Sequence, residues 1–191
     1  EGDNRYHVNC EKTGERFGDV VGTELAELSR SVFPLSEKRE DTWIGGISMG
    51  GYGCLINGLR HWENFGGIVS LGTGVRYKHL DRNSLREDAA VLTDRPGFFE
   101  AIYSDPGKVG ESEWNIENLA QMKKKEQIVF PDIYIGCGSE DWRAPEIKEL
   151  SEFLRGMGAE VTYEEVPGGH DNEAWDALLP RAFAWMKQKR N

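Results

Sequence analysis

The chain has 191 residues, and its 33 Asp and Glu against 23 Lys and Arg give it a formal net charge of −10. Such an excess of acidic residues argues against nucleic acid and against an anionic membrane surface as partners. No apolar run approaches the roughly 20 residues that a membrane-spanning helix needs. With 38% hydrophobic and 29% charged residues, the composition is typical of a globular protein, and we expect residues 1–191 to form a single domain.

The chain contains three cysteines, Cys10, Cys54 and Cys137, without C-x-x-C spacing, and an odd number cannot form a complete set of disulfides. Cys54 and Cys137 stand among apolar residues and are expected to be small core residues. This pattern favours a reducing compartment, and hence a cytoplasmic location. Because the chain begins with Glu1 rather than Met, the lack of a targeting segment carries no weight here.

Strand-like runs alternate with helical patterns, which predicts βα units around a mostly parallel sheet. Residues 1–17 are polar and are expected to form a loop. The elements expected next are a helix over 19–33 that ends before Pro34, a strand over 42–47, a helix over 49–60 and a strand over 67–71.

Residues 72–127 carry no clear strand signal, although a helix is expected near 115–126. So long an excursion between two strands predicts a small cap beside the functional site. A strand over 132–138 is expected next, followed by a helix that begins near Pro145 and is capped by Gly158. A strand over 161–166 then leads to a last helix, which starts after Asp171 or Asn172 and is kinked or restarted at Pro180. The order predicts an α/β fold with half to two-thirds of a doubly wound sheet.

The run Gly46-Ile47-Ser48-Met49-Gly50 has the pattern G-x-S-x-G between an apolar strand and an apolar helix. In a nucleophile elbow the serine occupies a strained turn that raises its hydroxyl above the C-terminal edge of the sheet. We therefore predict Ser48 as the nucleophile, with small residues needed two positions before and after it. The backbone N–H of Met49, at the start of the helix, is the predicted oxyanion donor. The alternative is a glycine-rich turn with a bystander serine.

A serine hydroxyl needs a base, and the candidates are His7, His61, His79 and His170. In the α/β-hydrolase order the histidine follows the acid, which follows the serine. His7 precedes Ser48, His61 ends the elbow helix away from the strand ends, and His79 precedes every plausible acid loop. His170 follows the last strand on a glycine-rich loop, so we predict it as the base, with a surface histidine as the alternative.

The acid is expected in the loop after the preceding strand, where Gly138-Ser139-Glu140-Asp141 lies. Asp141 is the predicted residue, and Glu140 is the second candidate, because either carboxylate can orient a histidine. Asp171 is adjacent to His170 and cannot easily fold back onto it. We interpret Asp171 as a helix cap.

At these residues the sequence resembles the esterase D-like branch of the α/β-hydrolases, most closely the tributyrin esterase group. Lys38–Gly53 resembles the elbow of that group, Cys137–Asp141 its acid loop, and Pro167–His170 followed by Trp175 its histidine loop. The opening Glu1–Asn4 resembles a loop that follows an early strand. The resemblance spans essentially the whole chain and implies an α/β-hydrolase fold in which the serine, aspartate and histidine act together.

One departure from that group is large. Its members carry an N-terminal section of several strands and an H-G-type loop that supplies the second oxyanion N–H. Without that section the elbow strand would be an exposed apolar edge. We therefore expect a partial chain whose sheet is completed by a missing N-terminal segment or by a second chain, and a homo-oligomer is left open.

The function expected is a serine carboxylesterase that hydrolyses short-chain acyl esters through an acyl-enzyme on Ser48, with a small-molecule ester as its partner. An acyltransferase with the same triad, and a catalytically impaired fragment or scaffold, are the alternatives, and a thioesterase is left open. Trp142, beside the acid, is a candidate substrate-binding residue, although tryptophans more often pack under a loop. No H-x-H or H-E-x-x-H spacing and no phosphate loop is present, so neither metal nor cofactor is expected.

Overall fold

The computed structural model describes residues 5–75, 78 and 98–190. Within them, four strands form one sheet in the order β3 (Trp43–Ile47), β4 (Gly67–Leu71), β5 (Asp132–Gly138) and β6 (Val161–Val166). All three neighbouring pairs are parallel, so the carboxyl ends of the strands meet at one edge of the sheet. The predicted α/β class is confirmed, and the four strand positions match the sequence pattern closely.

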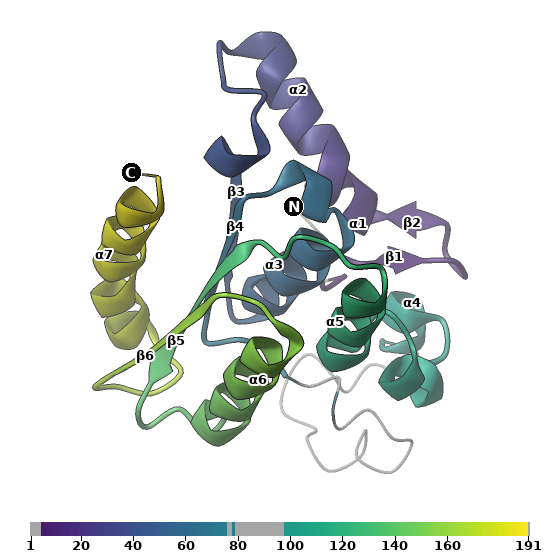
Figure 1. The fold of residues 1–191 in the computed structure, drawn as a ribbon. Coiled ribbons are helices and arrows are strands. Elements are labelled where there is room, and N and C mark those ends of the chain that lie inside the picture. Colours follow the sequence, from purple (N-terminus) through teal and green to yellow (C-terminus); the bar gives the residue numbers. More distant parts are fainter. Residues whose placement is uncertain (1–4, 76–77, 79–97, 191) are drawn as a thin grey trace.

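Helices cover both faces of this sheet (Figure 1). On one face lie α3 (Met49–Arg60) and α6 (Ala144–Met157), with α5 (Ile116–Lys125) packed beside them, and on the other lies α7 (Asn172–Lys189). Side chains alternate along each strand between these two layers. Ile68 of β4 belongs to the core under α3, whereas its neighbour Val69 belongs to the core under α7.

The residues predicted to begin and end the helices near the site lie at helix ends in the structure. Pro145 lies in the first turn of α6, and Gly158 ends that helix in the left-handed region at φ +103°. Asp171 caps α7, because its carboxylate accepts a hydrogen bond from the Ala174 N–H at 3.0 Å. The last helix does not restart at Pro180, because α7 runs on through it, and the kink expected as the other outcome stays a prediction. Its buried side chains on both sides of the proline, Leu178, Ala182 and Trp185, hold it on the sheet.

The N-terminal loop predicted over residues 1–17 contains a short antiparallel pair, β1 (Asn9–Cys10) with β2 (Glu15–Arg16). The chain then enters a helical run built from α1 (Phe17–Asp19), a π-helical turn (Val20–Glu24) and α2 (Leu25–Val32). The predicted helix is thus present and ends before Pro34. The hairpin was missed because two-residue strands leave no period in the sequence.

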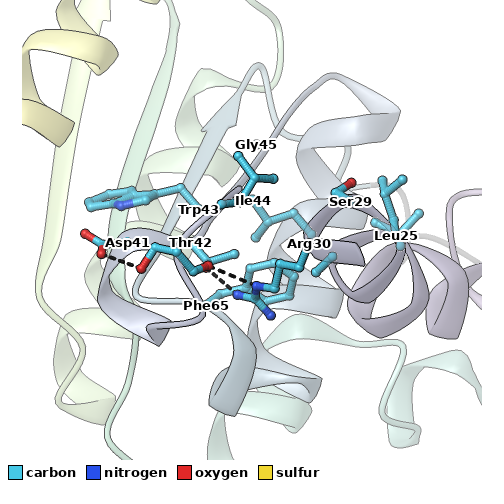
Figure 2. Close-up of a pocket in the computed structure, with 13 residues that line it drawn as sticks. Leu25, Ser29, Arg30, Asp41, Thr42, Trp43, Ile44, Gly45 and Phe65 are labelled. Carbon is cyan, nitrogen blue, oxygen red and sulfur yellow. Dashed lines mark hydrogen bonds between the residues drawn. The ribbon is translucent and has the colours of Figure 1, made fainter. Parts of the chain in front are cut away.

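The outer edge of β3 pairs with no other strand among the residues that the structure describes. Beside it lies a groove of about 460 Å³ between the strand and α2 (Figure 2). The apolar stripe of α2 faces outward here rather than into a core, with Leu25 54% and Leu28 62% exposed. A second apolar groove of about 400 Å³ lies on the α7 side of the same strand, with Phe183 on its wall. An unpaired edge between two apolar grooves favours pairing with a further strand.

The segment between β4 and β5 contains α4 (Glu100–Tyr103), the 3₁₀ segment Pro106–Glu111 and α5. Its apolar residues Ile102, Val109 and Leu119 are buried in the core under α3. Residues 76–77 and 79–97 lie outside the described residues, so the cap expected over 72–127 stays a prediction. Shorter 3₁₀ turns, Arg39–Asp41 and Trp62–Asn64, flank β3 and α3. Among the described helices, none has the length and apolar character to cross a membrane.

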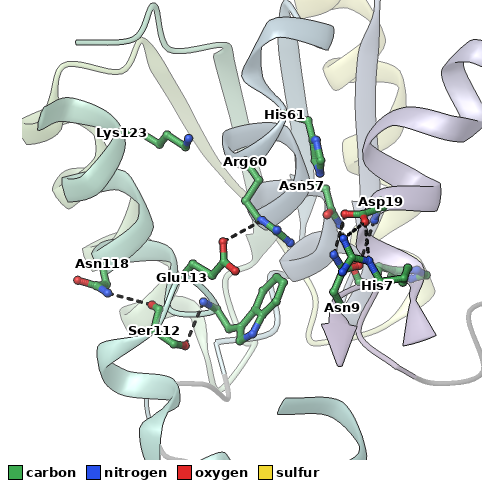
Figure 3. A network of polar contacts seen from close by, with 12 residues as sticks. His7, Asn9, Asp19, Asn57, Arg60, His61, Ser112, Glu113, Asn118 and Lys123 are labelled. Atoms are coloured by element: carbon green, nitrogen blue, oxygen red, sulfur yellow. Dashed lines mark hydrogen bonds and ion pairs between the residues drawn. The ribbon is translucent and has the colours of Figure 1, made fainter. Parts of the chain in front are cut away.

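A polar network joins the N-terminal hairpin to α3 (Figure 3). The Asn9 side chain donates to the Asp19 carboxylate at 2.7 Å, and the buried Asn57 amide donates to the backbone carbonyl of His7 at 2.7 Å. These bonds satisfy groups that would otherwise be buried without a partner. They fix the start of the described chain to the back of the helix that carries the elbow.

His61, which follows the last residue of α3, joins that helix to the π-helical turn Val20–Glu24. Its Nδ1 lies 3.2 Å from the Thr23 hydroxyl, and its ring packs so closely on Gly22 that a Cβ there would come within 2.1 Å of the imidazole. Burial, together with the neighbouring charge of Arg60, lowers the pKa of His61. Burial also lowers the pKa of His7.

These shifts predict a pH-dependent stability. Below about pH 6.5 the unfolded chain binds protons that the folded chain resists, so the free energy of unfolding should fall as the pH drops. Urea unfolding at pH 7.5 and at pH 5.5 measures this loss of stability. His61→Gln should reduce the difference in the free energy of unfolding between the two pH values, and His7→Gln measures how much of that difference comes from His7. If neither variant changed the pH dependence, its source would lie elsewhere.

Candidate active site

Ser48 stands in the turn between β3 and α3. Its φ is +56° with ψ −112°, in the region that L residues rarely adopt. The turn is held on both sides, because the Ser48 N–H donates to the Leu71 carbonyl at 2.8 Å and its carbonyl accepts from the Gly74 N–H at 3.0 Å. Strained backbone of this kind persists only where the surroundings fix it, and it is concentrated at functional sites. The predicted nucleophile elbow is therefore present.

The two glycines flanking the elbow are not equivalent. A Cβ on Gly46 would come within 2.2 Å of the backbone oxygen of Gly50, whereas a Cβ on Gly50 would meet nothing within 4 Å outside its own helix. The expectation that both positions must be small is thus right for Gly46 and wrong for Gly50. At Gly50 the helix direction carries the side chain away from the turn.

This asymmetry gives a matched pair of variants. Gly46→Ala should lower the free energy of unfolding by about 1–3 kcal/mol through the clash, and displacement of Ser48 should lower kcat by about 100-fold. Gly50→Ala should leave activity within about twofold and keep or raise stability, because alanine favours helix over glycine by about 1 kcal/mol. Thermal unfolding and ester hydrolysis measure both effects. Equal losses in the two variants would contradict this picture of the turn.

The three residues predicted as a triad meet at the carboxyl edge of the sheet. His170 Nε2 lies 2.8 Å from Ser48 Oγ, and His170 Nδ1 lies 2.7 Å from Asp141 Oδ2. Both are hydrogen-bond distances, so one imidazole links the hydroxyl to the carboxylate. The His170 side chain is 12% exposed and the Asp141 side chain 0% exposed. This arrangement can remove the proton of Ser48 and stabilise the imidazolium that forms.

The acid loop distinguishes between the two candidate carboxylates. Asp141 is buried and contacts His170, while Glu140 is exposed. The second oxygen of Asp141, Oδ1, accepts from the Arg143 N–H at 2.9 Å. Both carboxylate oxygens are therefore engaged, and Asp141 is held in one orientation. Glu140 is not the partner of the histidine.

The histidine loop approaches the acid loop closely because glycines stand where they meet. A Cβ on Gly138 would come within 2.2 Å of the Gly168 carbonyl oxygen, and Gly168 itself has φ +120°. Asp171 accepts hydrogen bonds from the N–H groups of Gly169 and Ala174, both at 3.0 Å. These two bonds lower the pKa of Asp171. Its predicted role as a helix cap is confirmed, and it fixes the loop on each side of His170.

Two tryptophans flank the imidazole of His170. The ring of Trp142 lies 5.1 Å from it, centre to centre and tilted by 51°, and the ring of Trp175 lies 5.2 Å from it, edge to face. Trp175 is partly buried, and a Cβ on Gly72 would come within 2.9 Å of its indole nitrogen. Gly72, which has φ +54°, was not predicted from the sequence as a residue of the site. The signal that could have indicated it is its position directly after the buried strand β4.

The other predicted site features are placed as follows. Met49 is the first residue of α3, in the turn whose N–H groups have no carbonyl partner within the helix. His7 and His61 lie behind α3 in the network of Figure 3, and His79 is outside the described residues. Among the described side chains, no group of three His, Cys, Asp or Glu is placed to hold a metal ion.

Comparisons with known proteins agree with this geometry. The chain matches the Esterase family model, described as "Putative esterase", over residues 3–186. It is 36% identical over 187 residues to an acetyl esterase from Caldicellulosiruptor saccharolyticus, and the match covers 98% of this chain and 70% of that protein.

Solved structures are similar as well. FphF, a fluorophosphonate-binding serine hydrolase from Staphylococcus aureus, superposes with a TM-score of 0.81 at 26% identity, covering 96% of this chain and 68% of that one. The S-formylglutathione hydrolase FrmB from the same organism superposes with a TM-score of 0.77 at 26% identity, covering 95% and 68%. These similarities place the chain among α/β-hydrolase-type esterases in fold.

Proposed function

Because this chain belongs to the Esterase family and is a serine carboxylic ester hydrolase, we propose that it hydrolyses short-chain acyl esters through an acyl-enzyme on Ser48. The observation that carries the proposal is the unbroken line of hydrogen bonds from Ser48 through His170 to Asp141. The similarity to an enzyme named acetyl esterase supports a small acyl group.

In the proposed reaction, His170 Nε2 takes the proton of Ser48 while Ser48 Oγ forms a bond to the ester carbonyl carbon. The tetrahedral intermediate collapses by breaking the bond to the alcohol oxygen, which receives the proton from His170. Water then repeats the attack on the acyl-enzyme, with His170 again as the base, and the carboxylic acid is released. Asp141 keeps the proton of the neutral imidazole on Nδ1, so that Nε2 is free to accept.

The negative oxygen of the intermediate needs donors, and the Met49 N–H is the proposed first one. It lies at the positive end of the twelve-residue helix α3, immediately after the nucleophile. We place the second donor on a segment that would lie along the free edge of β3, because a parallel strand there would end beside Ser48. Losing one such donor costs about 10²–10³ in rate.

The acyl specificity is tested with 4-nitrophenyl esters from acetate to octanoate. The proposal predicts the highest kcat/KM at acetate or butyrate, a steep fall towards octanoate, and a burst of nitrophenol equal to one site per chain at high substrate. A maximum at octanoate would contradict the short-chain proposal. Adding an alcohol acceptor in the same assay separates hydrolysis from acyl transfer, and a thioester of the same acid tests thioesterase activity.

A further inference from the structure

Trp142 is the one residue of the acid loop whose large apolar side chain faces solvent. Its side chain is 70% exposed, although its neighbour Asp141 is buried and its ring lies 5.1 Å from the ring of His170. An indole this exposed is not packed under a loop. It is, however, held in place, because the Arg143 guanidinium lies 5.0 Å above the ring. What distinguishes this exposed indole is its place beside the base, where a bound substrate can reach it.

The chemistry of the triad decides which part of an ester reaches this surface. The alcohol oxygen must lie within hydrogen-bond reach of His170 Nε2, since that nitrogen returns the proton to the leaving group. The carbonyl oxygen is drawn instead towards Met49 and the start of α3. The alcohol part is therefore the part of the ester that lies beside the imidazole. Of the two indoles that flank this ring, Trp175 is partly buried and Trp142 is exposed, so Trp142 is the one that can meet the alcohol part.

We infer that the exposed indole face of Trp142 binds the alcohol part of the ester, and that this alcohol carries a ring with a flat apolar face. This rests on the function proposed above and adds the class of alcohol to it. A planar indole gains most from a surface of the same shape, as an aromatic ring or the C–H face of a sugar ring provides, and little from a short open chain. The Arg143 guanidinium over the ring and the imidazole beside it limit the movement of the indole, so less freedom is lost on binding.

The test compares kcat/KM of the wild type and Trp142→Ala on esters that differ in one part at a time. Benzyl acetate and ethyl acetate share the acyl group and have alcohols of similar reactivity, and benzyl butanoate changes only the acyl group. A methyl xyloside acetate replaces the aromatic ring by a sugar ring. The ratio of wild type to variant should be about threefold to tenfold for the favoured ring alcohol and near one for ethyl acetate.

The acyl preference, benzyl acetate against benzyl butanoate, should be unchanged in Trp142→Ala. A large effect on benzyl acetate alone assigns the surface to aromatic alcohols, and a large effect on the xyloside acetate alone assigns it to sugars. Trp142→Phe should recover most of the loss. Phe183→Ala, which removes an aromatic ring of similar exposure from α7, is the matched control and should change none of these ratios.

Two results would overturn the inference, and they are distinguishable from failure of the function itself. An equal loss on ethyl and benzyl acetate would mean that Trp142 only positions His170. A change in acyl preference would place the acyl group, not the alcohol, against the indole. In both cases the activity would still depend on Ser48, whereas hydrolysis that survives Ser48→Ala would overturn the proposed function and this inference together.

Discussion

Ser48→Ala is expected to reduce kcat for 4-nitrophenyl acetate by on the order of 10⁵–10⁶-fold, close to the loss from removing a whole triad. The variant keeps the turn but removes the atom on which we propose that the acyl-enzyme forms. The His170–Asp141 pair remains, at 2.7 Å, with no hydroxyl to activate. Steady-state hydrolysis and the nitrophenol burst both measure this, and the burst should vanish.

Ser139→Ala is the matched control for this experiment. Ser139 is exposed and lies in the acid loop of the same site, two residues before Asp141, but its hydroxyl has no place in the line of hydrogen bonds. Its activity should stay within about twofold of the wild type, as surface substitutions usually do. A Ser48→Ala protein with a tenth or more of the wild-type rate would show that a different nucleophile is at work.

Asp141→Asn is expected to have the second large effect, a reduction of kcat by about 10⁴-fold. Asp141 accepts from the Arg143 N–H with Oδ1 and from His170 Nδ1 with Oδ2. An asparagine satisfies both neighbours only if its oxygen faces Arg143 and its NH₂ donates to His170 Nδ1. That places the imidazole proton on Nε2, where it blocks acceptance of the serine proton. The fold should be retained, because both contacts are still made.

Glu140→Gln is the control for the acid. It removes the charge of the exposed neighbouring carboxylate and should leave kcat nearly unchanged, with circular dichroism and unfolding temperature confirming that both variants fold. If Glu140→Gln lost more activity than Asp141→Asn, the choice between the two carboxylates would be reversed.

Much of the fold was predictable, because each element has a local signal. Buried parallel strands read as short apolar runs, and all four strands lie where those runs occur. The elbow pattern predicted Ser48, and chain order then predicted the acidic loop after the third strand and the histidine after the fourth. Only the structure distinguishes Asp141 from Glu140 in that loop. The resemblance to esterases is confirmed, whereas preference for tributyrin stays a prediction.

What the sequence could not supply depends on contacts between distant segments. The outward apolar stripe of α2 has the same helical period as a buried one, so only the structure shows that it is exposed and that Leu25 lines the groove beside β3. The close approach of Gly138 to the Gly168 carbonyl likewise joins residues 30 positions apart. The contact of Trp142 with His170, which gives the indole its significance, is of the same kind.

The most direct test of the central claim is covalent labelling with a fluorophosphonate, followed by mass spectrometry of the intact chain and of its peptides. A serine activated by a histidine reacts rapidly with such a reagent, whereas an ordinary serine hydroxyl does not. The wild type should gain a single adduct located on Ser48, Asp141→Asn should react far more slowly, and Ser48→Ala should gain none. An adduct on any other residue, or labelling of Ser48→Ala at the wild-type rate, would contradict the assignment of Ser48 as the nucleophile.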